Sequence, residues 1–115
     1  MRHSKKGRKF GREKRIREAL LKSLVRALVT HGKMETTVPR AKETKSIAEK
    51  LLTKAKKGDL ASRRHIRTWL MPKETEAIFK IASRHKNRPG GYTRIIRTRS
   101  RAHDRADMAV LEFLE

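Results

Sequence analysis

The sequence predicts an α+β fold of two layers, in which helices pack on a small three-stranded mixed sheet in the order helix, strand, three helices, two strands. Three observations favour this fold. Apolar residues recur at helical spacing over most of residues 13–85. The turn at Pro89, Gly90 and Gly91 excludes a helix, because proline and paired glycines favour turn geometry. The two segments after that turn have the length and the residues of strands.

Residues 1–12 are predicted to form a basic N-terminal arm that is disordered when free. Residues 1–15 hold eight Lys or Arg, one acid and two glycines. No apolar group there offsets the cost of ordering the backbone, about 1–2 kcal/mol per residue. A charge run is often only a solubilising tail, but cations of one sign interleaved with Gly and Phe10 favour an arm that lies along phosphates. Residues 13–115 then form a single α/β domain.

The first helix spans about residues 13–31, where Ile16, Leu20, Leu24 and Leu28 recur every four positions. Gly32 is typical of a left-handed residue that ends a helix. Residues 33–38 alternate as a short strand does. Pro39 then suits a first helical position and begins a helix that ends at Lys57.

The third helix follows Gly58 and Asp59, which are typical of a helix end and of an N-terminal cap. It carries Leu60, Ile66, Trp69 and Leu70, and Pro72 ends it. A fourth helix spans about residues 73–85. The strand after Gly91 and the strand over residues 107–114 form a hairpin around a polar loop at 100–106, and apolar residues on both faces favour an inner or shielded position for the last strand.

The hairpin is the second predicted binding surface. Eight Lys or Arg and one acid lie between Arg84 and Arg105. The two-residue period of a strand predicts that Arg94 shares a face with Tyr92, whereas Arg97 and Arg99 lie together on the other side. The guanidinium group of arginine binds phosphate oxygens through two hydrogen bonds, so for the arginines we favour phosphate binding. For the side chain of Tyr92 two roles remain open, which are stacking on an unpaired base and packing in the core.

The amino-acid composition limits the classes of function that we expect for this chain. The 32 basic and 12 acidic residues give a net charge of +20, which predicts a polyanionic partner, with nucleic acid as the leading candidate. The absence of cysteine excludes disulfides and thiolate metal sites. No apolar run is long enough for a membrane span, and no secretory signal is found, so we expect a cytoplasmic protein without a small-molecule substrate.

Catalysis and cofactors are not expected. No two histidines have the spacing of a helical metal site, and each of the five is expected at the surface or on a phosphate. The pairs Glu74 with Glu76 and Asp104 with Asp107 resemble nuclease carboxylates, but salt bridges or solvation explain them more simply. Arg63, Arg64 and Arg67 form a third basic cluster, for which a solvated face and a contact are equally favoured.

Several segments resemble the bacterial ribosomal protein L17 family across essentially the whole chain. The matching segments are Met1-Arg2-His3 with Gly7-Arg8-Lys9-Phe10, Ser23-Leu24 with His31, Thr36-Thr37 with Ala41-Lys42-Glu43, Ala55-Lys56 with Gly58-Asp59, Gly90-Gly91-Tyr92-Thr93-Arg94-Ile95, and Met108-Ala109 with Leu111-Glu112. The chain departs from the family at residues 13–16, and in the hairpin loop, where His103 precedes Asp104.

The resemblance implies an α/β fold with a three-stranded sheet, and non-catalytic binding to the RNA of the large ribosomal subunit. It also implies a position near the outer mouth of the polypeptide exit tunnel, with neighbouring ribosomal proteins in contact. The RNA-binding roles that it carries over fall on Arg2, His3, Gly7, Arg8 and Lys9 in the arm and on Gly90, Gly91, Tyr92 and Arg94 in the hairpin.

Charge alone adds the RNA-binding candidates Lys5, Lys6, Arg12, Arg15, Arg88, Arg97, Arg99 and Arg101. The sequence therefore predicts a structural constituent of the large ribosomal subunit that binds 23S rRNA through the arm and the hairpin. The alternative is a DNA-binding architectural or regulatory protein that uses the helices after Gly58 as a helix-turn-helix. Against it, the helix after Pro72 begins with Glu74 and Glu76, which repel phosphates.

Overall fold

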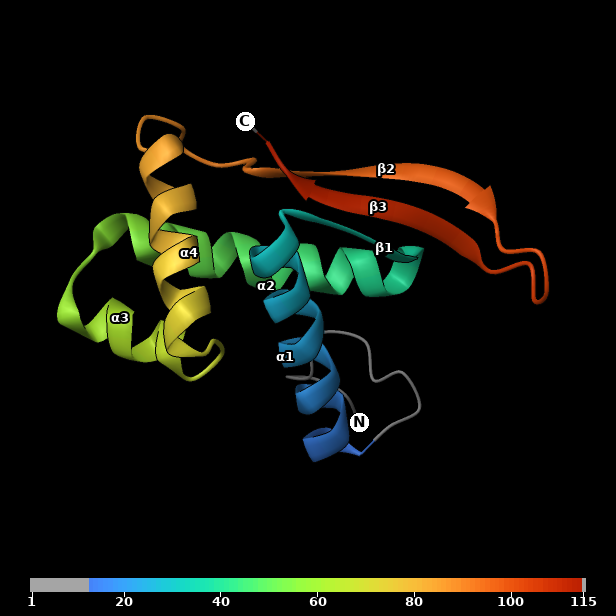
Figure 1. The fold of residues 1–115 in the computed structure, drawn as a ribbon, viewed down its shortest axis with the longest axis horizontal. Coiled ribbons are helices and arrows are strands. Elements are labelled where there is room, and N and C mark those ends of the chain that lie inside the picture. The colour runs from blue at the N-terminus through green and yellow to red at the C-terminus, as the bar shows by residue number, and fades with distance from the viewer. Residues whose placement is uncertain (1–12, 115) are drawn as a thin grey trace, which may run out of the picture.

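The computed structural model describes residues 13–114 (Figure 1). The predictions made for the arm, residues 1–12, lie outside this part of the chain. The elements are α1 Lys14–His31, β1 Lys33–Thr37, α2 Val38–Lys57, α3 Leu60–Arg67, α4 Pro72–Arg84, β2 Thr93–Ser100 and β3 Asp107–Phe113. The predicted α+β class and the predicted order of elements are confirmed.

The sheet is antiparallel throughout, so the prediction of a mixed sheet is wrong in this respect. Its strand order is β1-β3-β2, and β3 pairs antiparallel with both neighbours. The three helices between β1 and β2 leave a gap between these two strands. The last strand of the chain, β3, occupies this gap. β3 is therefore the central strand, in agreement with the apolar residues on both of its faces.

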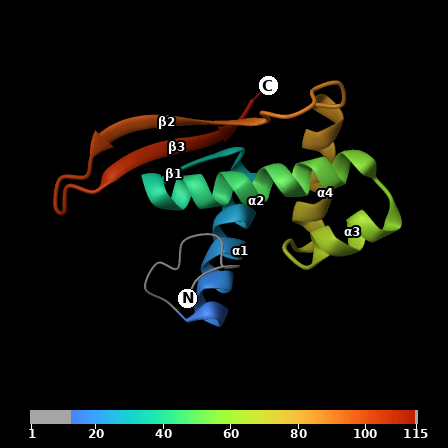
Figure 2. The same cartoon turned by 180° about the vertical axis from the view of Figure 1, so that it is seen from behind.

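The helices cover one face of the sheet. In Figures 1 and 2, α2 runs along this face, α1 and α4 lie crosswise to α2, and α3 lies at the end away from the hairpin. The side chains of Val25 and Leu28 from α1, Leu52 from α2, Ile78 from α4 and Leu111 from β3 are fully buried in the shared core. Truncation of any of these leucines to alanine costs about 2–5 kcal/mol.

The predicted helix ends are confirmed where capping residues define them. Gly32 ends α1 with a φ of 80°, a conformation that residues with a Cβ rarely adopt. Asp59 caps α3, because its Oδ1 accepts a hydrogen bond from the Ser62 amide at 2.7 Å. Its interactions with the side chain of Ser62 and then with this amide hold the pKa of Asp59 below its usual value.

Two predicted core positions are wrong. Leu60 is 62% exposed, because the first turn of α3 faces solvent, and Ile16 is 47% exposed in the first turn of α1. The third helix is also shorter than predicted: α3 ends at Arg67, and Trp69 and Leu70 lie in the turn that leads to α4.

Candidate nucleic-acid interface

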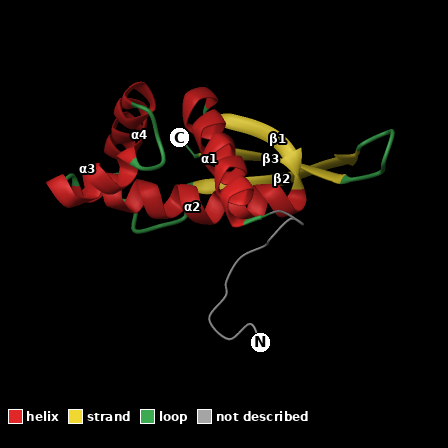
Figure 3. Cartoon of the chain, turned by 90° about the horizontal axis from the view of Figure 1, so that it is seen from below, coloured by secondary structure: helices red, strands yellow, loops and turns green. Residues whose placement is uncertain are grey.

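The β2–β3 hairpin extends beyond the helices that cover the rest of the sheet (Figure 1; Figure 3). The Arg101 amide donates to the Ala106 carbonyl at 2.8 Å and closes the loop between the strands. Asp104 organises this loop, since it accepts two hydrogen bonds from the Arg101 guanidinium, at 3.0 and 2.6 Å, and one from the Ala106 amide. The Arg101 hydrogen bond is the main reason that the pKa of Asp104 lies far below its usual value.

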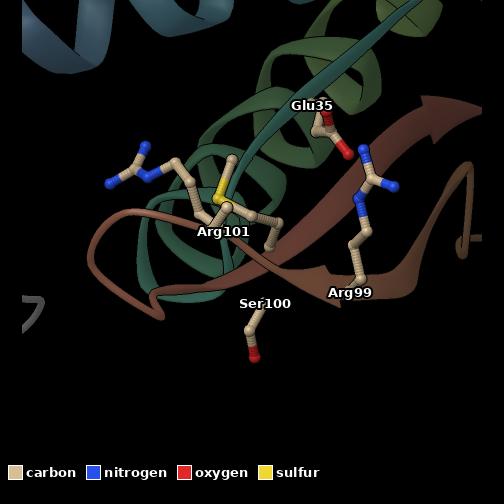
Figure 4. A pocket seen from close by; sticks show the side chains of 6 residues that line it. Glu35, Arg99, Ser100 and Arg101 are labelled. Atoms are coloured by element: carbon tan, nitrogen blue, oxygen red, sulfur yellow. The ribbon is translucent and has the colours of Figure 1, made fainter.

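Arg97 and Arg99 lie on opposite faces of the hairpin, so the prediction that they lie together is wrong. The register of β2 against β3 shifts by one residue between Arg97 and Ser100, as a β-bulge does. Arg97 lines a surface depression with Pro39 and Arg40 at the start of α2. Arg99 lines a different one with Glu35 and Met108, on the face that the helices leave open (Figure 4).

Tyr92 packs in the core, so the base-stacking interpretation is wrong for this conformation. Its side chain is 1% exposed, and its ring meets that of His85 edge to face with centroids 5.7 Å apart. The Lys56 ammonium donates to the Tyr92 hydroxyl at 2.9 Å and lies 4.9 Å from the ring centre. Tyr92 precedes β2, and its buried ring does not share a face with Arg94, whose side chain is 60% exposed.

Lys56 and Glu49 together fix the entry of the chain into β2. Lys56 also donates to the Arg88 carbonyl. Glu49 accepts hydrogen bonds from the Tyr92 amide at 3.3 Å and from the Thr93 amide at 3.1 Å. Sequence reasoning missed both residues, although they are seven positions apart and therefore share one face of α2.

The two neighbouring glycines differ in what the fold requires of them. Gly91 has a φ of 65°, a conformation that strains any residue with a Cβ. Gly90 has no positive φ, and a Cβ added there meets no atom within 4 Å. The fold of the described residues therefore explains Gly91 but not Gly90.

The candidate arginines differ in their ion pairs. Arg94 donates to Glu112 at 2.5 Å, and Arg101 is paired with Asp104. The side chain of Arg88 donates to the Gly91 carbonyl at 3.3 Å. Within residues 13–114, no carboxylate pairs with the three remaining candidates, which are Arg15, Arg97 and Arg99. The arm candidates Arg2, His3, Lys5, Lys6, Gly7, Arg8, Lys9 and Arg12 lie outside the described residues.

The expectation that every histidine lies at the surface or on a phosphate is wrong for His85. This side chain is 2% exposed, and its Nε2 has no hydrogen-bond partner among the described atoms. Burial is the main reason that its pKa lies below the usual value, and the nearby charges of Arg88, Arg84 and Lys56 lower it further.

The carboxylates that resembled a nuclease pair are engaged elsewhere. Glu74 accepts hydrogen bonds from Arg26 at 2.8 and 3.1 Å, and Glu76 lies 3.7 Å from Arg63. Glu74 also accepts from the Met71 amide at the start of α4. This carboxylate occupies the beginning of the helix that a helix-turn-helix would present to DNA, so the geometry weakens the DNA-binding alternative.

Among residues 13–114, no cluster of three metal-binding side chains is found, and no helix is long and apolar enough to cross a membrane.

Comparison with known proteins gives one consistent result. The family model described as ribosomal protein L17 matches residues 20–114. The chain is similar to the large ribosomal subunit protein bL17 of Campylobacter concisus, with 47% identity over 99% of this chain and 98% of the relative. It is also similar to the bL17 proteins of Campylobacter jejuni, with 47% identity over 99% of each chain, and of Magnetococcus marinus, with 43% identity over 100% of this chain and 94% of the relative.

Proposed function

The chain belongs to the ribosomal protein L17 family, and we propose from this that it binds 23S rRNA through its basic hairpin and its N-terminal arm. Membership of the family makes it a structural constituent of the large ribosomal subunit, found in the cytoplasm as part of the ribosome. It also agrees with the expectation that the chain is not an enzyme. The finer proposal concerns which residues meet the RNA.

The observation that carries this proposal is the position of Arg97 and Arg99. Both are exposed, neither has a carboxylate partner within residues 13–114, and they lie on opposite faces of a hairpin that projects from the helices. Guanidinium groups bind phosphate oxygens through two parallel hydrogen bonds. A hairpin with such groups on both faces fits between two RNA segments and neutralises phosphates on each side.

Arg94 and Arg101 have a different role in this proposal, because Glu112 and Asp104 already hold them. Their carboxylate partners orient the guanidinium groups before RNA arrives. Gly90 leaves open space at the base of the hairpin, where a phosphate approaches the backbone closely. The arm residues Arg2, Arg8 and Lys9 extend this basic surface in the proposal through their charge and the family resemblance.

The family resemblance further supports a position near the outer mouth of the polypeptide exit tunnel, in contact with neighbouring ribosomal proteins. Photo-reactive groups placed in nascent chains of increasing length test this position. Crosslinks to this protein are expected only once the nascent chain is long enough to emerge, and crosslinks to other proteins alone at every length contradict it.

Density-gradient sedimentation of a gently prepared lysate tests assembly first. We expect about one copy per large subunit at low salt. Filter binding to deproteinised 23S rRNA then tests the mechanism, and affinity is expected to fall by about 0.7–0.9 logarithmic units per phosphate contact for each tenfold rise in salt. A preference for duplex DNA over folded rRNA at matched salt would support the DNA-binding alternative.

A further inference from the structure

A second basic site lies between α1 and the turn that joins α3 to α4. We call it the Trp69 notch, a surface depression lined by Lys22, Arg26, Arg67, Thr68, Trp69, Leu70 and Met71. None of these residues belongs to the arm or to the hairpin. Figures 1 and 2 show that the turn between α3 and α4 lies on the far side of α1 from the hairpin tip.

One part of the lining of the notch is aromatic and apolar. Trp69 is half-buried against the core, and Met71 beside it is 55% exposed. Trp69 is the only tryptophan of the chain, in which aromatic residues make up 4%. Among the described residues, no acceptor is hydrogen-bonded to its indole N–H. An exposed indole edge combines an apolar surface with a hydrogen-bond donor.

The other part of the lining is positively charged. The Lys22 ammonium lies 5.9 Å from the centre of the Trp69 ring, and Arg67 approaches from the end of α3. Arg26 is four residues after Lys22 and therefore shares its helix face, but it is held by Glu74. Glu74 is also bonded to the Met71 amide. Within the described chain, no carboxylate forms an ion pair with Lys22 or Arg67.

We propose that the Trp69 notch is a second rRNA contact, at which Lys22 and Arg67 bind backbone phosphates while Trp69 and Met71 lie against a ribose or an unpaired base. RNA is favoured over a protein segment, because two unpaired cations beside an aromatic edge are typical of nucleic-acid contacts. This inference rests on the proposed function. Contacts at two separate sites, the notch and the hairpin, fix the orientation of the protein on the RNA.

The single tryptophan permits a direct test. Full-length protein is titrated with deproteinised 23S rRNA, with total binding followed on filters and the notch followed by Trp69 fluorescence. We expect binding to change the emission of Trp69 and to protect it from acrylamide quenching. The double variant Lys22→Ala/Arg67→Ala is expected to retain partial binding with a salt slope reduced by about 1.4–1.8, the value for two lost phosphate contacts.

The matched control is Lys50→Ala/Lys80→Ala, which removes the same number of positive charges from exposed positions outside the notch, the hairpin and the Arg63, Arg64 and Arg67 cluster. Its slope is expected to stay at the wild-type value, and circular dichroism checks that both double variants are folded. If rRNA binds while Trp69 shows neither an emission change nor protection, the proposal of an rRNA contact at the notch is overturned and the proposed function stands. Equal slopes for the two double variants also overturn the notch. If wild-type protein does not bind rRNA on filters, the proposed function itself fails.

Discussion

Glu49 holds Thr93 at the start of β2 through a single oxygen atom, Oε1, which accepts hydrogen bonds from the Thr93 amide at 3.1 Å and from its hydroxyl at 2.7 Å. The other carboxylate oxygen accepts from the Tyr92 amide. The family-like segment from Gly90 to Ile95 is therefore attached to α2 by hydrogen bonds. Its tyrosine and threonine fix the hairpin to the helices, while Arg94 stays exposed and pairs with Glu112.

Replacement of Glu49 by glutamine tests this attachment. Glutamine has the same shape as glutamate, but it is uncharged. Its NH2 group is a donor and cannot accept the hydrogen bonds that a carboxylate oxygen accepts. Hydrogen bonds to charged groups contribute about 1.5–3 kcal/mol, so we expect Glu49→Gln to lower the free energy of unfolding by about 2 kcal/mol. Urea denaturation measures this. The control Glu18→Gln changes an exposed residue of α1 and is expected to stay within about 0.5 kcal/mol of wild type. Equal stability of the two variants would contradict the attachment.

Truncation of Tyr92 separates core packing from an RNA role. Because this ring is 1% exposed, Tyr92→Ala is expected to destabilise the protein by about 3–5 kcal/mol. Tyr92→Phe loses only the hydrogen bond with Lys56 and is expected to cost about 0.5–1.5 kcal/mol. Thermal and urea denaturation check both values. An alanine variant as stable as wild type but weak in rRNA binding would restore the stacking interpretation.

The sequence predicts every element of this fold because each has a local signal. Gly32 and Gly58 end α1 and α2, and Asp59 caps α3, through interactions within a few residues. The positive charge of the protein is also predictable, because net charge follows from composition and does not depend on tertiary structure. The central position of β3 agrees with its apolar residues on both faces.

What the sequence does not predict depends on residues that are distant in the chain. The contacts of Tyr92 with Lys56 and His85 come from α2 and from the C-terminal cap of α4, so a strand period alone cannot decide whether the ring is buried. The bulge that separates Arg97 from Arg99 has no marker residue of its own, and a shift of one residue moves a side chain to the other face. The Trp69 notch forms where α1 lies beside the end of α3, so it also depends on residues that are distant in the chain.

His85 predicts a pH dependence of stability. Its pKa is lowered in the folded protein, chiefly by burial, so the unfolded chain binds its proton first as the pH falls. Stability is then complete above the unfolded value of about 6.5 and declines as the pH decreases below it. We expect the melting temperature of wild type to fall between pH 7.5 and 5. The fall is expected to be smaller in His85→Phe, which keeps a ring beside Tyr92. Parallel pH profiles of the two proteins would contradict this assignment.

Removal of residues 1–12 tests the division between arm and domain. The buried cluster of the described residues lies between Val25 and Phe113. We expect the truncated protein to keep its cooperative thermal transition and to bind 23S rRNA more weakly, with a smaller salt slope. Loss of the cooperative transition would mean that the arm belongs to the core.

Adjacent glycines give the sharpest test of the hairpin base as a binding surface. Gly91→Ala places a Cβ at a φ of 65° and is expected to destabilise the protein by about 1 kcal/mol. Gly90→Ala meets no atom within 4 Å and no positive φ, so the free protein is expected to be as stable as wild type or slightly more stable. If a phosphate approaches the backbone at Gly90, its added methyl group weakens rRNA binding without any loss of stability. Denaturation and filter binding on the two variants measure these effects separately. Wild-type affinity in Gly90→Ala would show that the RNA does not approach the backbone there, and that this glycine is needed neither by the fold nor by binding.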